Sequence, residues 1–190
     1  MLRAFIFAQT SILVRHWFEI DLKDSSMEHG ARVEVRHLDP QPHRGTESAA
    51  QRFVVDRPIW RADLFDRLNG VPGGFEAAHH HPVFDGVEPS ARVYLDEDPW
   101  EWLRDRLGDI EKTCAAAGPP AEIAADAEAV RESAAEIVAA AQALAPARCD
   151  SVRRCHRWTA DVAETVRLMA ATTARPDRLD RARIAPWMSD

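Results

Sequence analysis

The sequence lacks the features that would assign it to several large functional classes. It has three cysteines, Cys114, Cys149 and Cys155, and an odd number without paired spacing argues against a secreted disulfide scaffold. No apolar run approaches the roughly 20 residues that span a bilayer. The phosphate-binding, dinucleotide-binding and serine-nucleophile motifs are all missing, which disfavours ATP-driven, Rossmann-type redox and serine-hydrolase chemistry. We therefore expect a cytoplasmic protein without a membrane span.

Positive charge is also scarce. The 190 residues carry 24 Lys and Arg against 31 Asp and Glu, a formal net charge of −7. Nucleic-acid binding depends largely on phosphate neutralisation, so this balance disfavours a DNA or RNA partner. Apolar residues make up 46% of the chain, enough for a chain of this length to bury a core without disulfides.

The pattern of apolar residues changes near Pro99. Before it, residues 12–22 and 31–38 alternate between apolar and polar with a period of two, which predicts two strands that pair as an antiparallel hairpin. Residues 51–65 predict one or two further strands bent at Pro58, 75–84 an extended segment, and 91–95 a last strand. These segments predict a curved antiparallel sheet, with a barrel as one form that it could take.

After Pro99 the pattern is helical. Asp98 is a candidate N-cap, Pro99 suits the first helical position, and a helix is expected to Ala117. In the next helix, residues at heptad spacing alternate with alanines, which is typical of a helix–helix seam. Its acidic residues, Asp126 among them, are expected to face the arginines of a second helix. We thus predict an α+β fold with an α+β domain over residues 1–117, an antiparallel helical hairpin over 118–174 and a tail over 175–190. The hairpin is expected either to cover the sheet or to form a dimer interface, and the narrow seam with its alanines favours a homodimer.

Three consecutive histidines, His79, His80 and His81, are the strongest indication of chemistry. In an extended segment His79 and His81 point to one face and His80 to the other. His16 and His37 fall on the apolar faces of the first two strands, so four histidines are expected to converge on one interior. Imidazoles in such a place are typical ligands of Zn²⁺, Fe²⁺ or another divalent metal such as Mn²⁺. Asp63 or Asp85 is the candidate carboxylate ligand, and the alternative is that each histidine is an ordinary core residue.

Two resemblances involve the same histidines. The sequence Gly73-x5-His79-x-His81-x3-Asp85 is similar to the first motif of the cupins, small β-barrels that hold a metal with histidines and a glutamate. Asp85 stands where glutamate is usual, and the later strand histidine that this family needs is missing. Blocks from Trp60 to Leu103, including His79-His80-His81-Pro82, also resemble an uncharacterised, mainly actinobacterial protein family, a resemblance that implies no activity.

Arg61 and Asp63 form a second candidate pair. Their parity places them inward, where they would form a buried ion pair or bind an anion, unless the strand has already left the sheet. Arg61, Asp63 and His80 are therefore the candidate catalytic residues. The sequence supports a small metal-dependent enzyme as the first hypothesis, and a non-catalytic interaction protein, which binds another protein or itself through its hairpin, as the second. A toxin-like nuclease with histidines as general acid and base is a third.

Overall fold

A computed structural model describes residues 2–20, 27–40, 53–68, 70–88, 90–117 and 121–145. The predicted second helix of the hairpin, including His156, and the tail lie outside these residues. All described residues except Ile20 and Met27 belong to one compact unit, and the description below concerns that unit. None of the described helices is long and apolar enough to cross a membrane.

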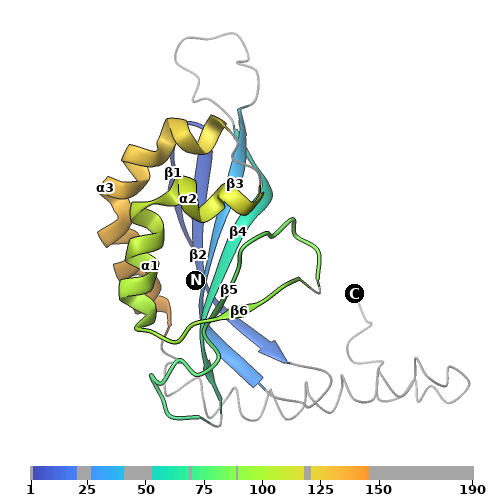
Figure 1. Cartoon of the computed structure of the whole chain (residues 1–190), viewed down its shortest axis with the longest axis vertical. Coiled ribbons are helices and arrows are strands. Elements are labelled where there is room, and N and C mark those ends of the chain that lie inside the picture. Colours follow the sequence, from blue (N-terminus) through green and yellow to red (C-terminus); the bar gives the residue numbers. More distant parts are fainter. Residues whose placement is uncertain are drawn as a thin grey trace, which may run out of the picture. The chain divides into compact units, whose positions relative to one another are not determined.

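Six antiparallel strands form one open sheet with the strands in sequence order (Figure 1). The strands are β1 (Leu2–Ile6), β2 (Thr10–Ile20), β3 (Met27–Pro40), β4 (Phe53–Arg67), β5 (His79–His81) and β6 (Val93–Tyr94). The predicted pairing of β2 with β3 is confirmed. The sheet does not close, so the barrel alternative is wrong, and the cupin-like motif does not bring a cupin barrel with it.

The bend predicted at Pro58 corresponds to an irregularity inside one long strand. The register between β3 and β4 shifts on either side of Arg36, which pairs with Pro58. Proline has no backbone N–H and cannot donate to the ladder, so a bulge at this point is the expected accommodation. The strand then continues to Arg67, which places Arg61 and Asp63 inside the sheet.

Three α-helices cover one face of the sheet (Figure 1): α1 (Pro99–Gly108), α2 (Ile110–Cys114), followed by the short 3₁₀ turn η1 (Ala115–Ala117), and α3 (Ala121–Leu144). The N-cap prediction is confirmed, because the Asp98 carboxylate accepts hydrogen bonds from the amides of Trp100 and Glu101. The single helix expected to Ala117 is instead interrupted at Asp109, which ends α1 and caps α2. Glycine at 108 and an aspartate able to cap a new helix explain the break.

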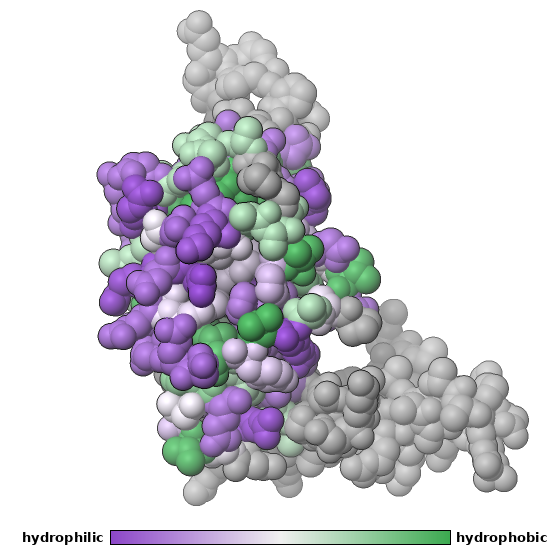
Figure 2. Space-filling model, in the orientation of Figure 1, coloured by the Kyte–Doolittle hydropathy of each residue, from purple (hydrophilic) through white to green (hydrophobic). Residues whose placement is uncertain are grey.

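The core lies between the helices and this face of the sheet. It joins strand residues such as Val14, Val33 and Leu64 to Leu103 of α1 and Ile137 of α3. The heptad seam of α3 is buried, and α3 packs against α1 and α2. The seam from which we expected a dimer therefore has partners within the chain, and the homodimer stays a prediction. Outward surfaces of these helices are hydrophilic (Figure 2).

Asp126 has a different role from the one its charge pattern predicted. Its carboxylate is buried and accepts hydrogen bonds from the amides of Ala8, Gln9 and Thr10 and from the Thr10 hydroxyl, at 2.7–3.1 Å. It therefore fixes α3 to the turn between β1 and β2, and the arginines predicted to face it lie outside the described residues.

Candidate metal centre

The opposite face of the sheet carries a buried group of charged and imidazole side chains. Alternation along β4 places Trp60, Ala62 and Leu64 in the core, and Arg61 and Asp63 on the other face. In the register of β4 with β5, Arg61 pairs with His81 and Asp63 pairs with His79. Paired residues of antiparallel strands point to the same side. The strand order therefore brings the two histidines to the arginine and the aspartate.

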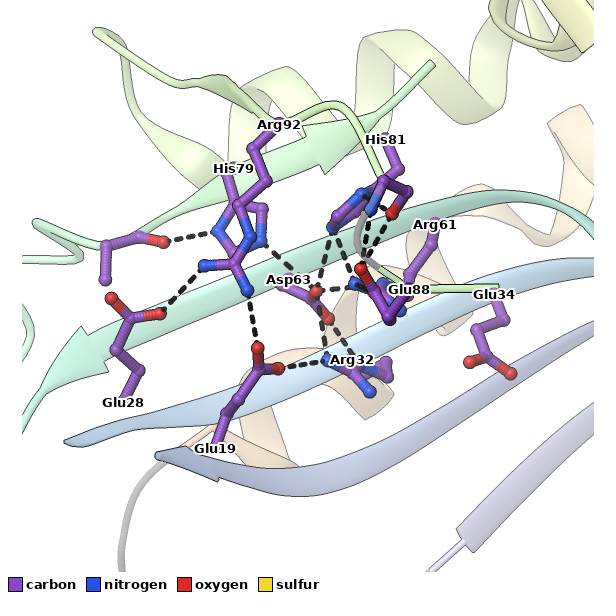
Figure 3. A network of polar contacts seen from close by, with 12 residues as sticks. Glu19, Glu28, Arg32, Glu34, Arg61, Asp63, His79, His81, Glu88 and Arg92 are labelled. Carbon is purple, nitrogen blue, oxygen red and sulfur yellow. Dashed lines mark hydrogen bonds and ion pairs between the residues drawn. The ribbon is translucent and has the colours of Figure 1, made fainter. Parts of the chain in front are cut away.

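Asp63, His79 and His81 form a compact donor set (Figure 3). The Nε2 atoms of His79 and His81 each lie 3.4 Å from Oδ2 of Asp63. All three residues are 0% exposed. A separation of 3.4 Å is longer than the usual N–H···O hydrogen bond, about 2.7–3.2 Å. Ligands at about 2.1 Å from a tetrahedral metal are about 3.4 Å apart, so the spacing matches that of a first coordination shell.

The hydrogen bonds of the two rings determine which nitrogen carries the proton in each neutral imidazole. His79 Nδ1 lies 2.8 Å from the carbonyl oxygen of Ala77, and because a carbonyl only accepts, Nδ1 is the donor. In the neutral ring Nε2 then carries a lone pair, and it has no hydrogen-bond partner among the described residues. Metal-binding histidines usually donate their second nitrogen in this way, which fixes the ring and its tautomer.

His81 has the same tautomer for a different reason. A guanidinium only donates, so the 2.7 Å contact between Arg61 and His81 Nε2 makes that nitrogen the acceptor. The Nδ1 proton is then donated to the Ser90 hydroxyl at 2.7 Å, and Ser90 donates in turn to Glu88. Burial lowers the pKa of His81, which keeps the ring neutral, as a metal ligand must be.

Two arginines hold Asp63 in its ionised form. Arg32 of β3 donates two hydrogen bonds to the carboxylate, at 2.6 and 3.1 Å. Arg61 Nε lies 2.9 Å from Oδ2 but is not aligned as a hydrogen bond. Burial raises the pKa of Asp63, but the charge and the hydrogen bonds of Arg32 act in the opposite direction, and that pKa lies far below its usual range. The carboxylate is therefore available as an anionic ligand.

The charges of this face balance one another. Ion pairs link five arginines to five carboxylates: Arg15, Arg32, Arg36, Arg61 and Arg92 with Glu19, Glu28, Glu34, Asp63 and Glu88. Together these ten side chains carry no net charge. Such a balance permits burial, since an unpaired buried charge is costly.

Glycine and aromatic residues shape the walls of the site. A Cβ on Gly30 would lie 2.1 Å from the carbonyl oxygen of Leu64, so only glycine allows β3 and β4 to approach this closely. Gly30 pairs with Phe65, whose ring meets the His79 ring edge-on. Residues following β5 cover the other side, where Phe84 contacts the His81 ring and lies under the Arg61 guanidinium.

The structure separates the remaining predicted site residues from this group. His16 contacts the carbonyl oxygen of Leu144 at the end of α3, and the half-buried His37 lies within electrostatic range of Glu122 of α3. The expected convergence of four histidines is therefore wrong, because an open sheet has two separate faces. Asp85 is exposed and accepts a hydrogen bond from the amide of Val87. His80 lies on the helix side, beside Trp60 and Trp102.

The parts of the site that we did not foresee come mainly from β2, β3 and the segment after β5: Glu19, Glu28, Arg32, Glu88, Ser90 and Arg92. A signal was present in β3, where Arg32 and Glu34 alternate with apolar residues. Opposite charges at matching positions of the next strand, Asp63 and Arg61, favour a paired inner face over a solvated one.

Comparisons with known proteins identify no relative of this chain. No family model, no curated protein and no solved structure matches this chain. The two resemblances given above stay predictions, and the case for the site depends on its geometry.

Proposed function

We propose that this protein is a metal-dependent enzyme whose divalent ion is held by Asp63, His79 and His81. One observation carries the proposal. Two buried imidazole nitrogens, each with its lone pair inward, lie 3.4 Å from the same carboxylate oxygen. Arg61 already serves His81 Nε2, but in the neutral ring the lone pair of His79 Nε2 has no hydrogen-bond partner among the described residues and faces this carboxylate, which is unfavourable at low dielectric unless a cation lies between them.

The donor set also favours a catalytic over a structural ion. Structural zinc sites usually have four protein ligands, whereas catalytic sites keep a position for water or substrate. Three ligands of the type nitrogen, nitrogen and oxygen suit Zn²⁺, Fe²⁺ or Mn²⁺. A bound ion of this kind would supply Lewis-acid chemistry or an activated water. Ala77 and Ser90 would orient the two rings, and Arg32 would orient the carboxylate.

The test is elemental analysis by inductively coupled plasma mass spectrometry on tag-free protein. The wild type is compared with His79→Ala/His81→Ala, and with His80→Leu as the matched control from the same strand and the opposite face. We expect about one metal per chain in the wild type and in His80→Leu, and none in the double variant.

No metal in the wild type, even after reloading with Zn²⁺, Fe²⁺ and Mn²⁺, would contradict the proposal. The network would then be a charge-balanced scaffold, and the non-catalytic interaction protein would become the better hypothesis. Equal metal loss in His80→Leu and in the double variant would also contradict it, because the ion would not depend on the inner face.

A further inference from the structure

Arg61 stands where an incoming metal ion would have to bind. Its side chain is 2% exposed. One terminal nitrogen lies 2.7 Å from His81 Nε2, and Nε lies 2.9 Å from Asp63 Oδ2. The guanidinium therefore contacts two of the three candidate ligands, at the atoms that would coordinate the ion (Figure 3).

These contacts and metal coordination exclude one another. The lone pair of His81 Nε2 accepts either the Arg61 proton or a metal, because an imidazole nitrogen has only one. A divalent ion beside an unmoved guanidinium would also place like charges within a few ångströms in a buried site. Arg61 must therefore leave this nitrogen before His81 can coordinate a metal.

The structure offers a place for the displaced guanidinium. The nitrogen that contacts His81 also donates to Glu88 at 2.5 Å. Glu88 is the exposed end of the pair, with 45% of its side chain accessible. The amide and hydroxyl of Ser90 both donate to its other oxygen, at 2.8 and 3.0 Å. A small outward rotation of Arg61 thus keeps its carboxylate partner while it gives up His81.

Arg61 forms ion pairs with Asp63 and Glu88, and the pair with Asp63 has the poorer hydrogen-bond geometry. Its Nε–H is not aligned with any acceptor among the described residues. The aspartate keeps both hydrogen bonds from Arg32 when Arg61 moves. The loss of Arg61 therefore leaves the carboxylate oriented and paired.

We propose that Arg61 is a resident cation of the metal-free site, which leaves His81 and Asp63 for Glu88 when the metal binds. This inference rests on the proposed function, since it concerns the same three ligands. Arg61 then regulates metal affinity. Without metal its positive charge pairs with Asp63 and Glu88, and a metal ion must displace its charge-assisted contact with His81 in order to bind. An oxygen-preferring ion such as Mg²⁺ or Ca²⁺ gains little from the freed imidazole nitrogen.

The test measures Zn²⁺ affinity of the full chain by competition with a chromophoric chelator. Arg61→Met removes the guanidinium and keeps an apolar stem against Phe84. Arg36→Met is the matched control, because Arg36 is also an ion-paired arginine of this sheet, although less buried, and it bonds Glu34 and the Asp56 carbonyl rather than the three ligands. We expect Arg61→Met to bind Zn²⁺ about tenfold or more tightly than the wild type, and Arg36→Met to match the wild type.

Circular dichroism and denaturant unfolding first establish that each variant folds. Arg61→Gln, a neutral polar replacement, gives the same comparison if the methionine variant does not fold. Equal or weaker Zn²⁺ binding by the Arg61 variant, with normal binding by the wild type, would overturn the role of Arg61 and leave the metal site intact. No Zn²⁺ binding by any variant would overturn the proposed function and this inference with it.

Discussion

The two faces of the same strands differ in almost every physical respect. Toward the helices, β2, β3 and β4 present residues such as Val14, Val33 and Leu64, which pack against α1 and α3. On the other face, Arg32, Arg61 and Asp63 are equally buried but are charged. Successive side chains along one strand therefore point alternately into an apolar core and into a network of ion pairs on the opposite face.

The difference indicates which face maintains the fold and which serves a function. Burial of apolar area is favourable whatever the details of packing. A buried ion-pair network gains little net stability, because desolvation offsets attraction, and apolar replacements are often neutral or stabilising. A chain that keeps five arginines and five carboxylates on one face accepts this cost for a reason other than stability. We infer that the reason is the donor set at Asp63, His79 and His81.

The largest expected effect follows from breaking the ionic face at its centre. Asp63→Asn keeps the shape of the side chain but leaves Arg32 and Arg61 without their shared buried anion. We expect the free energy of unfolding to fall by about 3–5 kcal/mol, the usual cost of an uncompensated buried charge. Urea unfolding measures this loss, with Asp56→Asn as the control, because Asp56 is an exposed residue of the same strand. A loss below about 1 kcal/mol would show that the network is not energetically coupled.

Truncation of a core side chain on the apolar face should lower the stability of the protein without changing its affinity for metal. Leu103 of α1 is fully buried in the core, so Leu103→Ala should lower the free energy of unfolding by about 3 kcal/mol through lost burial and a cavity. Zn²⁺ affinity, measured in the same preparation, should stay at the wild-type value. A parallel loss of Zn²⁺ affinity would mean that the two faces are not independent.

Bound metal should stabilise the folded protein only through the ionic face of the sheet, which carries Asp63, His79 and His81. An ion that binds the folded state alone, at 100 times its dissociation constant, raises the free energy of unfolding by about 2.7 kcal/mol. We expect this increase in the wild type and in Leu103→Ala, and none in His81→Ala. Thermal unfolding with and without Zn²⁺ measures it, and a Zn²⁺ effect that survives in His81→Ala would place the ion elsewhere.

The smallest expected effect separates His80 from its two neighbours. Burial first, then the positive charge of Arg106, lowers the pKa of His80 from 6.5 to about 4. As the pH falls from about 6.5 toward 4, the unfolded chain takes up the proton before the folded chain does, so stability is lost through that window. The full shift corresponds to about 3 kcal/mol, and solvent screening of this partly exposed ring reduces the expected loss to about 2 kcal/mol. His80→Leu should not show this loss of stability between pH 6.5 and 4. Identical pH profiles for the two proteins would show that His80 is not the group responsible.

Much of the fold could be predicted from local patterns. Alternation in residues 12–22 and 31–38 was enough for two paired strands, and Asp98-Pro99 was enough for the start of α1. The break at Asp109 was missed because the apolar spacing from Leu103 to Ile110 continues across it. The intramolecular partners of the α3 seam could not be predicted either, since a heptad pattern shows that a face is buried but not which helix covers it.

The candidate site was predictable only in part, for a reason of geometry. Parity within one strand separated His79 and His81 from His80, and it placed Arg61 and Asp63 on one face. It could not relate faces of different strands, because that requires strand order and register. His16 and His37 lie on the apolar faces as predicted, but His79 and His81 do not share that side of the sheet, and Arg32 and Glu19 were not assigned to the site.

The most direct test of the account is an anomalous-difference X-ray map of crystals grown with Zn²⁺, recorded on both sides of the zinc absorption edge. The account predicts one strong peak on the polar face of the sheet, about 2.0–2.2 Å from Nε2 of His79, Nε2 of His81 and a carboxylate oxygen of Asp63. The Arg61 guanidinium should have turned toward Glu88. A map without a peak at these three atoms, with Arg61 still bonded to His81 at saturating Zn²⁺, would contradict it.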